Sequence, residues 1–119
     1  ILSFAKEVQQ LREREVKDII LDPGFGFGKD LQQNYAVFNG LEELRALELP
    51  LLIGVSRKRM IYQLVGGDAS TALNGTTAIH AASLMKGANI LRVHDVAEAV
   101  ETVKIISAMQ QSSPNDEWT

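Results

Sequence analysis

The chain has 119 residues, enough for one domain of ordinary size, and its 45% hydrophobic and 23% charged residues are typical of a globular protein in water. Its formal net charge is −3 and no basic run occurs, so the sequence excludes a typical nucleic-acid partner. It contains no cysteine, which excludes disulfides and thiolate metal sites, and no apolar run long enough to cross a bilayer, so we expect a cytoplasmic protein without membrane contact.

The first part of the chain predicts a helix, a strand and a second helix. Apolar residues at helical spacing indicate a helix over roughly residues 3–14. The run VKDIILD at 16–22 is short, apolar and rich in β-branched residues, as a buried strand is. Beyond a glycine-rich turn, helical spacing returns from Tyr35 to Leu47, and Pro50 marks the end of one continuous helix.

The middle of the chain predicts another strand, a short helix and a longer helix. LPLLIGVS at 49–56 has the composition of a second buried strand. A short helix is expected around RMIYQLV at 59–65, closed by two glycines at 66–67. The threonines at 76–77 are candidate caps for a helix that runs to Lys86.

The last part of the chain predicts a third strand, a final helix and a polar tail. NILRVH at 89–94 is the strand. Asp95 is expected to cap the helix that follows, with Glu98 three residues on as the second member of a capping box. From Ser107 the composition turns polar, and we expect residues 109–119 to form a frayed tail.

Strands that alternate with helices predict an α/β fold with a parallel sheet. The three strand exits, IILDPG, LIGVSRK and LRVHD, each end in groups that can do chemistry. In a parallel sheet these exits meet at one edge, which is where α/β folds bind their ligands. The sequence therefore predicts one binding site built from three strand ends.

A pocket for an anion is expected at that edge. Arg92 and His94 are two residues apart, so on a strand their side chains project to the same face, and Gly54 would open room on its own strand. An acidic chain that gathers cations at one place is suited to hold an anion there. The polar residues expected to line the pocket are Asp22, Ser56, Lys58, Arg92 and His94, with Lys29 and Arg57 close by in sequence.

Several of these residues also have simpler interpretations. DPG is common turn chemistry, which would account for Asp22 without a ligand. Phe25 and Phe27 are more often loop anchors packed on a core than ligand platforms, and Ser56 could serve only as a helix cap. The glycine spacing fits neither a Walker A loop nor a dinucleotide-binding fingerprint.

Three motifs, DPGFGFGK, LLIGVSRKRMI and ILRVHDV, occur in an order and spacing that resemble the C-terminal half of the bacterial dihydropteroate synthase family. The resemblance covers roughly residues 1–108. It implies a pterin-binding (β/α)8 TIM barrel, of which this chain would supply three βα units with parallel strands. It also implies the condensation of 6-hydroxymethyl-7,8-dihydropterin pyrophosphate with p-aminobenzoate. The products are 7,8-dihydropteroate and pyrophosphate, on the path to folate, and sulfonamides compete with p-aminobenzoate.

The resemblance also implies roles for residues at the strand ends. Asp22 is expected to accept hydrogen bonds from the pterin ring, and Arg92 to stack over the ring and, with His94, to bind the pyrophosphate. No residue is expected to act as a general acid or base, and a magnesium ion would find its ligand outside this chain. The expected pterin-binding residues are Asp22, Gly54, Lys58 and Arg92, and the expected p-aminobenzoate-binding residues are Gly26, Phe27 and Ser56.

The implied barrel needs eight strands, and this chain supplies three. We therefore expect the chain to be a fragment that is inactive alone, that needs the missing N-terminal half of the barrel, and that belongs to a homodimer. Two alternatives stay open. One is a pterin-dependent methyltransferase domain, which shares the barrel and a DPG-like turn, and the other is a non-catalytic fragment that binds an anion or self-associates.

Overall fold

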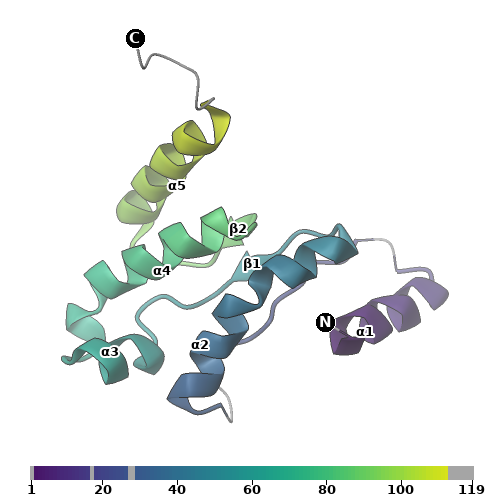
Figure 1. Cartoon of the computed structure of the whole chain (residues 1–119), viewed down its shortest axis with the longest axis horizontal. Helices are drawn as coiled ribbons and strands as arrows, with labels where there is room; N and C mark the ends of the chain where they lie inside the picture. Colours follow the sequence, from purple (N-terminus) through teal and green to yellow (C-terminus); the bar gives the residue numbers. More distant parts are fainter. Residues whose placement is uncertain (1, 17, 27–28, 113–119) are drawn as a thin grey trace.

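The structure, a computed structural model, describes residues 2–16, 18–26 and 29–112. Figure 1 shows its two strands near the middle of the molecule, with α1 on one side of them and α5 on the other. In chain order the elements are α1 (Leu2–Glu13), α2 (Leu31–Asn39), the 3-10 helix η1 (Leu41–Leu47), β1 (Leu52–Ile53), α3 (Arg59–Val65), the 3-10 helix η2 (Ala69–Thr71), α4 (Leu73–Met85), β2 (Ile90–Leu91) and α5 (Val96–Gln111).

The centre of the fold is a parallel arrangement of three short segments. β1 pairs in parallel with β2, and on its other side Leu51 forms a parallel bridge with Leu21. The Leu21 N–H donates to the Pro50 carbonyl and its own carbonyl accepts from the Leu52 N–H, both at 2.8 Å. The expected parallel order is therefore confirmed, although the strand expected at 16–22 is reduced to a single bridge in the part of it that the structure describes.

Alternation along these segments covers one face of the sheet and leaves the other open. Leu21, Ile53 and Val55 are buried against the helices, with exposed fractions of 3%, 0% and 0%. Side chains of the opposite face are accessible, because Ile20 is 55% exposed and Ile90 is 37% exposed. Within the described part of the chain, no element covers this second face, on which the polar strand ends lie.

A pair of stacked aromatic rings anchors the glycine-rich turn to the core. Phe25 is fully buried, and its ring stacks on that of Phe38 from α2 with centroids 4.3 Å apart and an interplanar angle of 11°. The expectation that Phe25 anchors the loop is confirmed, whereas Phe27 lies outside the described residues. The stacking of Phe25 on Phe38 thus holds the turn after Leu21 against α2.

The helix expected from Tyr35 to Leu47 is wrong as one element, because the structure breaks it in two. α2 ends at Asn39, and Gly40 separates it from the 3-10 turns of η1. The Gly40 N–H still bonds back to carbonyls of the last turn of α2, so the glycine acts as the helix stop. Apolar spacing continues across this point because both elements pack against the same core.

The start of α4 also differs from the expected one. The helix begins at Leu73, so Thr76 lies inside it instead of capping it. The Thr76 hydroxyl donates to the Ala72 carbonyl four residues earlier, at 2.6 Å. By contrast, α3 spans the predicted residues 59–65 and is followed by Gly66 as its C-cap.

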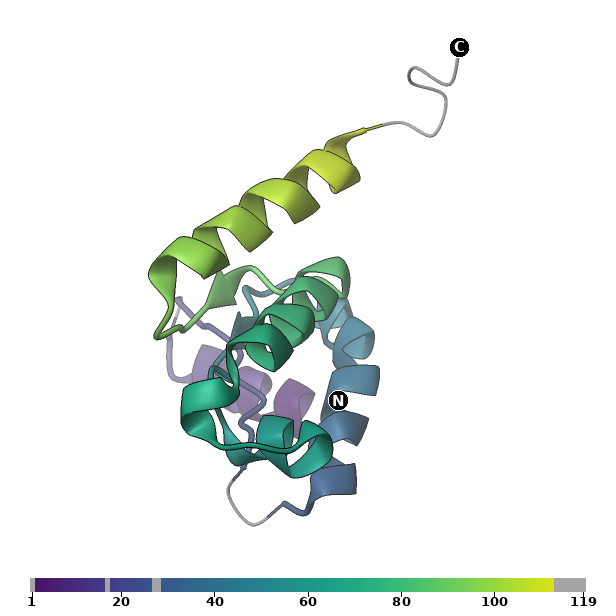
Figure 2. The same cartoon turned by 90° about the vertical axis from the view of Figure 1, so that its left-hand side faces the viewer.

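The last helix follows Asp95 as expected but lacks the expected capping box. Asp95 makes no side-chain bond to the start of α5, because its carboxylate binds Arg57 instead. α5 packs against α4 and continues to Gln111, into the range expected to fray, and Figure 2 shows it extending away from the rest of the molecule. None of the helices described here has the length and apolar character needed to cross a membrane.

Replacing Phe25 by alanine should lower the free energy of unfolding by about 3–5 kcal/mol, because it removes a buried ring and its stacking contact with Phe38. Denaturant titration measures the change. Val65→Ala is the matched control, since Val65 is 70% exposed, and it should change the free energy by less than about 0.5 kcal/mol. Equal losses in the two variants would contradict the anchoring role.

Candidate functional site

The strand ends meet around Gly54, which follows β1 and has no side chain. Continuing the register of the sheet places Gly54 beside Arg92, and a Cβ on Gly54 would stand 2.7 Å from the guanidinium carbon. Glycine therefore leaves the space in which the guanidinium lies. From there Arg92 reaches across the central strand, and its Nη1 comes within 3.7 Å of a carboxylate oxygen of Asp22. The missing side chain at position 54 thus lets two outer strand ends approach each other.

The two carboxylate oxygens of Asp22 have different contacts, one within the turn and one on the open face of the sheet. One oxygen, Oδ1, accepts a hydrogen bond from the Gly24 N–H at 3.0 Å, which is the turn that DPG favours. The other oxygen, Oδ2, is the one that faces Arg92. The turn interpretation and a ligand-binding role are therefore compatible in one side chain.

Lys58 joins the site from the second strand exit. Its Nζ donates to the Phe25 carbonyl at 3.0 Å, which ties it to the glycine-rich turn. Burial, reinforced by the positive charge of Arg92, lowers the pKa of the Lys58 ammonium, and Asp22 acts in the opposite direction. A bound anion would stabilise the charged ammonium, so this pair of cations suits a negatively charged ligand.

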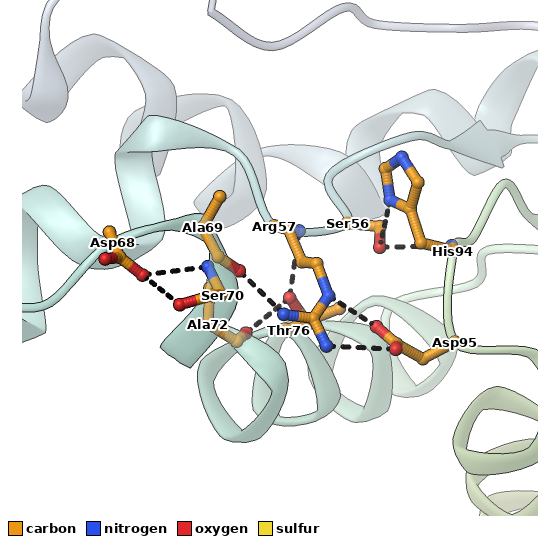
Figure 3. A network of polar contacts seen from close by, with 9 residues as sticks. All are labelled: Ser56, Arg57, Asp68, Ala69, Ser70, Ala72, Thr76, His94 and Asp95. Atoms are coloured by element: carbon orange, nitrogen blue, oxygen red, sulfur yellow. Dashed lines mark hydrogen bonds and ion pairs between the residues drawn. The ribbon is translucent and has the colours of Figure 1, made fainter.

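Ser56 and His94 connect the second and third strand exits. The buried Ser56 Oγ accepts from the His94 backbone N–H at 3.2 Å and lies 2.8 Å from the ring Nδ1 (Figure 3). Arg92 and His94 share one cavity, as their spacing predicts, and Ser56 is not the cap of α3, whose N-cap is Lys58. The cavity measures about 120 Å³ and is lined by Gly54, Ser56, Lys58, Arg92, Val93 and His94.

A larger cavity of about 460 Å³ opens beside Lys58 and contains Lys29 and Gly26 in its wall. Its wall is held by Asn34, a buried residue of α2 that the sequence reasoning did not single out. The Asn34 side chain accepts from the Gly26 N–H at 2.9 Å and donates to the Asp30 carbonyl at 3.1 Å. The sequence did offer a signal for this role, because Asn34 is a polar amide at a position of α2 that faces the core.

Arg57 takes no part in either cavity, although the sequence places it among the site cations. Its Nε and Nη2 bind the two carboxylate oxygens of Asp95 at 2.8 and 3.0 Å, and Nη1 donates to the Ala69 carbonyl at 2.6 Å (Figure 3). Hydrogen bonding from Arg57 lowers the pKa of the Asp95 carboxyl. The residue therefore joins separate chain segments and lies outside both cavities.

No group of three or more potential metal ligands gathers anywhere in residues 2–16, 18–26 or 29–112. The side chains present therefore do not fit a metal centre of their own. The chemistry that these residues offer is the binding of an anion by cations, of hydrogen-bond donors by a carboxylate, and of small polar groups by Ser56.

Comparisons with known proteins identify relatives of this chain. Residues 2–94 match the family described as pterin binding enzyme. Over 100 residues the chain is 44% identical to the dihydropteroate synthase of Escherichia coli (strain K12), which covers 84% of this chain and 36% of that protein. The chain thus spans about a third of the length of this curated relative.

Solved structures with the same fold carry informative ligands. The structure of Yersinia pestis DHPS with a pterine-sulfa conjugate is 38% identical, with a TM-score of 0.89 over 94% of this chain and 45% of that one. A dihydropteroate synthase from Coxiella burnetii in complex with pteroic acid is 33% identical, with a TM-score of 0.86 over 91% and 41%. The expected fold, part of a (β/α)8 barrel with parallel strands, is confirmed by these similarities.

Gly54→Ala should weaken the binding of inorganic pyrophosphate about tenfold, because the new methyl group would displace the Arg92 guanidinium and remove a charge-assisted contact. Titration calorimetry measures the affinity. Gly40→Ala is the matched control, since a Cβ there meets only backbone oxygens at an ordinary 3.8 Å, and it should leave the affinity within about twofold. A similar loss in both variants would show that space for Arg92 is not what matters.

Proposed function

This chain belongs to the pterin-binding enzyme family, and on that premise we propose that it is the C-terminal part of a dihydropteroate synthase. The observation that carries the proposal is the meeting of Asp22, Lys58 and Arg92 around Gly54, with His94 in the same cavity. One acid and three basic groups suit a substrate that joins a ring with N–H donors to a multiply charged leaving group. The activity would belong to the whole enzyme, since this chain spans only about a third of the Escherichia coli relative.

The pterin ring would lie on the open face of the sheet, against Asp22 and Arg92. The Asp22 oxygen that does not serve the turn would accept hydrogen bonds from ring N–H groups. The planar guanidinium of Arg92 would stack on the ring, a contact that lysine cannot make as well. Gly54 would contribute by its lack of a side chain, and Lys58 would reach the polar edge of the ring.

The reaction would then proceed by departure of the pyrophosphate. The bond between the pterin methylene carbon and the pyrophosphate oxygen breaks, and the electron pair leaves with the oxygen. Arg92 and His94 would bind the departing anion, stabilising the charge that develops on it. The nitrogen of p-aminobenzoate donates its electron pair to the methylene carbon, forms the new C–N bond and releases one proton to water.

p-Aminobenzoate would bind between the glycine-rich turn and the second strand exit, near Gly26 and Ser56, with Phe27 on the same turn. The larger cavity beside Lys58 would receive its carboxylate end, because Lys29 and Arg59 also line it. The Yersinia pestis relative binds a pterine-sulfa conjugate and the Coxiella burnetii relative binds pteroic acid, which supports adjoining sites for the two substrates and for sulfonamides.

The remaining strands of the barrel would complete the site. They would cover the open face, where Ile20 and Ile90 are exposed, and their residues would provide the ligand for the magnesium ion that the family resemblance implies. No step of the mechanism above passes through that ion. The chain alone would then be inactive, and the homodimer stays a prediction from the resemblance.

The full-length protein should form 7,8-dihydropteroate and pyrophosphate from the pterin pyrophosphate and p-aminobenzoate, and this chain alone should not. Chromatography with mass detection of the product measures both. Binding of a folate without condensation would favour the methyltransferase alternative. Binding of neither substrate would favour a non-catalytic protein, and efficient turnover by the 119-residue chain would contradict the need for the other strands.

Asp22→Asn should weaken the binding of a pterin to the full-length protein by roughly 1–3 kcal/mol, about 5- to 150-fold, because the amide presents a donor to ring N–H donors. The melting temperature should change little, since asparagine keeps an oxygen for the Gly24 N–H. Titration of the variant with a pterin, alongside its thermal melt, measures both. Unchanged affinity with a lowered melting temperature would reduce Asp22 to a turn residue.

A further inference from the structure

Two links join the second and third strand exits, and they point to opposite sides of the chain. On the cavity side, the Ser56 Oγ lies 2.8 Å from the His94 Nδ1. One residue further along each exit, Arg57 binds both carboxylate oxygens of Asp95. Figure 3 shows the Arg57 side chain directed towards the helix that carries Thr76 and the His94 ring directed away from it.

The backbone of Arg57 is held in an unfavourable conformation. Its φ angle is 55°, in the left-handed region that residues with a Cβ seldom adopt. Bonds to three neighbours oppose the strain: the guanidinium binds Asp95 and the Ala69 carbonyl, and the backbone N–H donates to the Thr76 Oγ1 at 3.0 Å. A strained residue with this many partners is one whose conformation the surrounding structure determines.

The left-handed residue lies between two residues of the smaller cavity. Ser56 and Lys58 both line that cavity, whereas Arg57 between them does not. Neither Arg57 nor Asp95 lines that cavity or the larger one, so a ligand bound in either cavity would not contact the pair. Both side chains are partly buried, at 23% and 21% exposure, and hydrogen bonding from Arg57 lowers the pKa of Asp95 so that the pair stays ionised.

We propose that Arg57 and Asp95 are positioning residues that hold Ser56, Lys58 and His94 in the geometry that binds the anion. The proposal rests on the proposed function in that the anion is the pyrophosphate of the pterin substrate. Without the ion pair, Arg57 leaves the left-handed conformation, and the contact of Ser56 with His94 is lost. The Lys58 ammonium then moves away from Arg92, and the two cations no longer converge on one ligand.

Two variants of the full-length protein test this role. Asp95→Asn keeps the size of the side chain but removes its charge, and Arg57→Lys keeps the charge but cannot bind both oxygens through a planar fork. Both should bind inorganic pyrophosphate about tenfold more weakly in titration calorimetry. The NMR signals of the His94 ring should shift in both ligand-free variants, because the ring loses its fixed contact with Ser56.

The matched control removes another ion pair that joins distant segments. Glu42 of η1 binds Lys86 after α4 at 2.9 Å, and Glu42→Gln should leave the pyrophosphate affinity within about twofold and the His94 signals unshifted. Unshifted His94 signals in the Asp95 and Arg57 variants would overturn the proposal, as would an equal loss of affinity in the control.

Pyrophosphate binding and dihydropteroate formation by the wild-type protein separate the role of the ion pair from the proposed reaction. A wild-type protein that binds pyrophosphate but forms no dihydropteroate would refute the proposed reaction, and the variants would still report on the ion pair. A wild-type protein that binds no pyrophosphate would overturn both proposals.

Discussion

The whole site depends on the parallel pairing of three chain segments through the backbone of residues 50–53. Peptide groups of this stretch bind Leu21 on one side and residues 89–92 on the other. Because the three segments run the same way, an acid, a basic loop and an Arg-x-His pair leave the sheet at one edge. A shift of one residue in either pairing would turn Asp22 or Arg92 to the helix-covered face, so the register decides whether a site exists.

Features that depend on neighbouring residues could be predicted from the sequence. The range of α3, the loop anchor Phe25 and the common cavity of Arg92 and His94 follow from local patterns of spacing, glycine stops and strand alternation. The parallel order follows from the alternation of strands and helices. These patterns are physical properties of short stretches of chain, and they indicate such features even though the contacts themselves are made with distant residues.

Features that depend on competition between partners could not be predicted in the same way. Asp95 followed by Glu98 has the spacing of a capping box, but Arg57, 38 residues earlier, takes the carboxylate with two charge-assisted bonds. Thr76 is a good cap by type, yet its hydroxyl bonds within the helix and accepts from the Arg57 backbone. A local cap and a tertiary partner are alternatives for the same oxygen, and the sequence does not rank them.

Because the Arg92 guanidinium occupies the space left by Gly54, substitutions at the two positions depend on each other. Once a side chain fills the space at position 54, the guanidinium is already displaced, so a later substitution of Arg92 causes little further loss of binding. The effects of the two substitutions are therefore not additive, and the order in which they arise matters. A residue larger than glycine at position 54 should therefore be tolerated only after Arg92 has lost its role. A relative with a larger residue at this position would then be one in which the arginine on the neighbouring strand no longer serves the site.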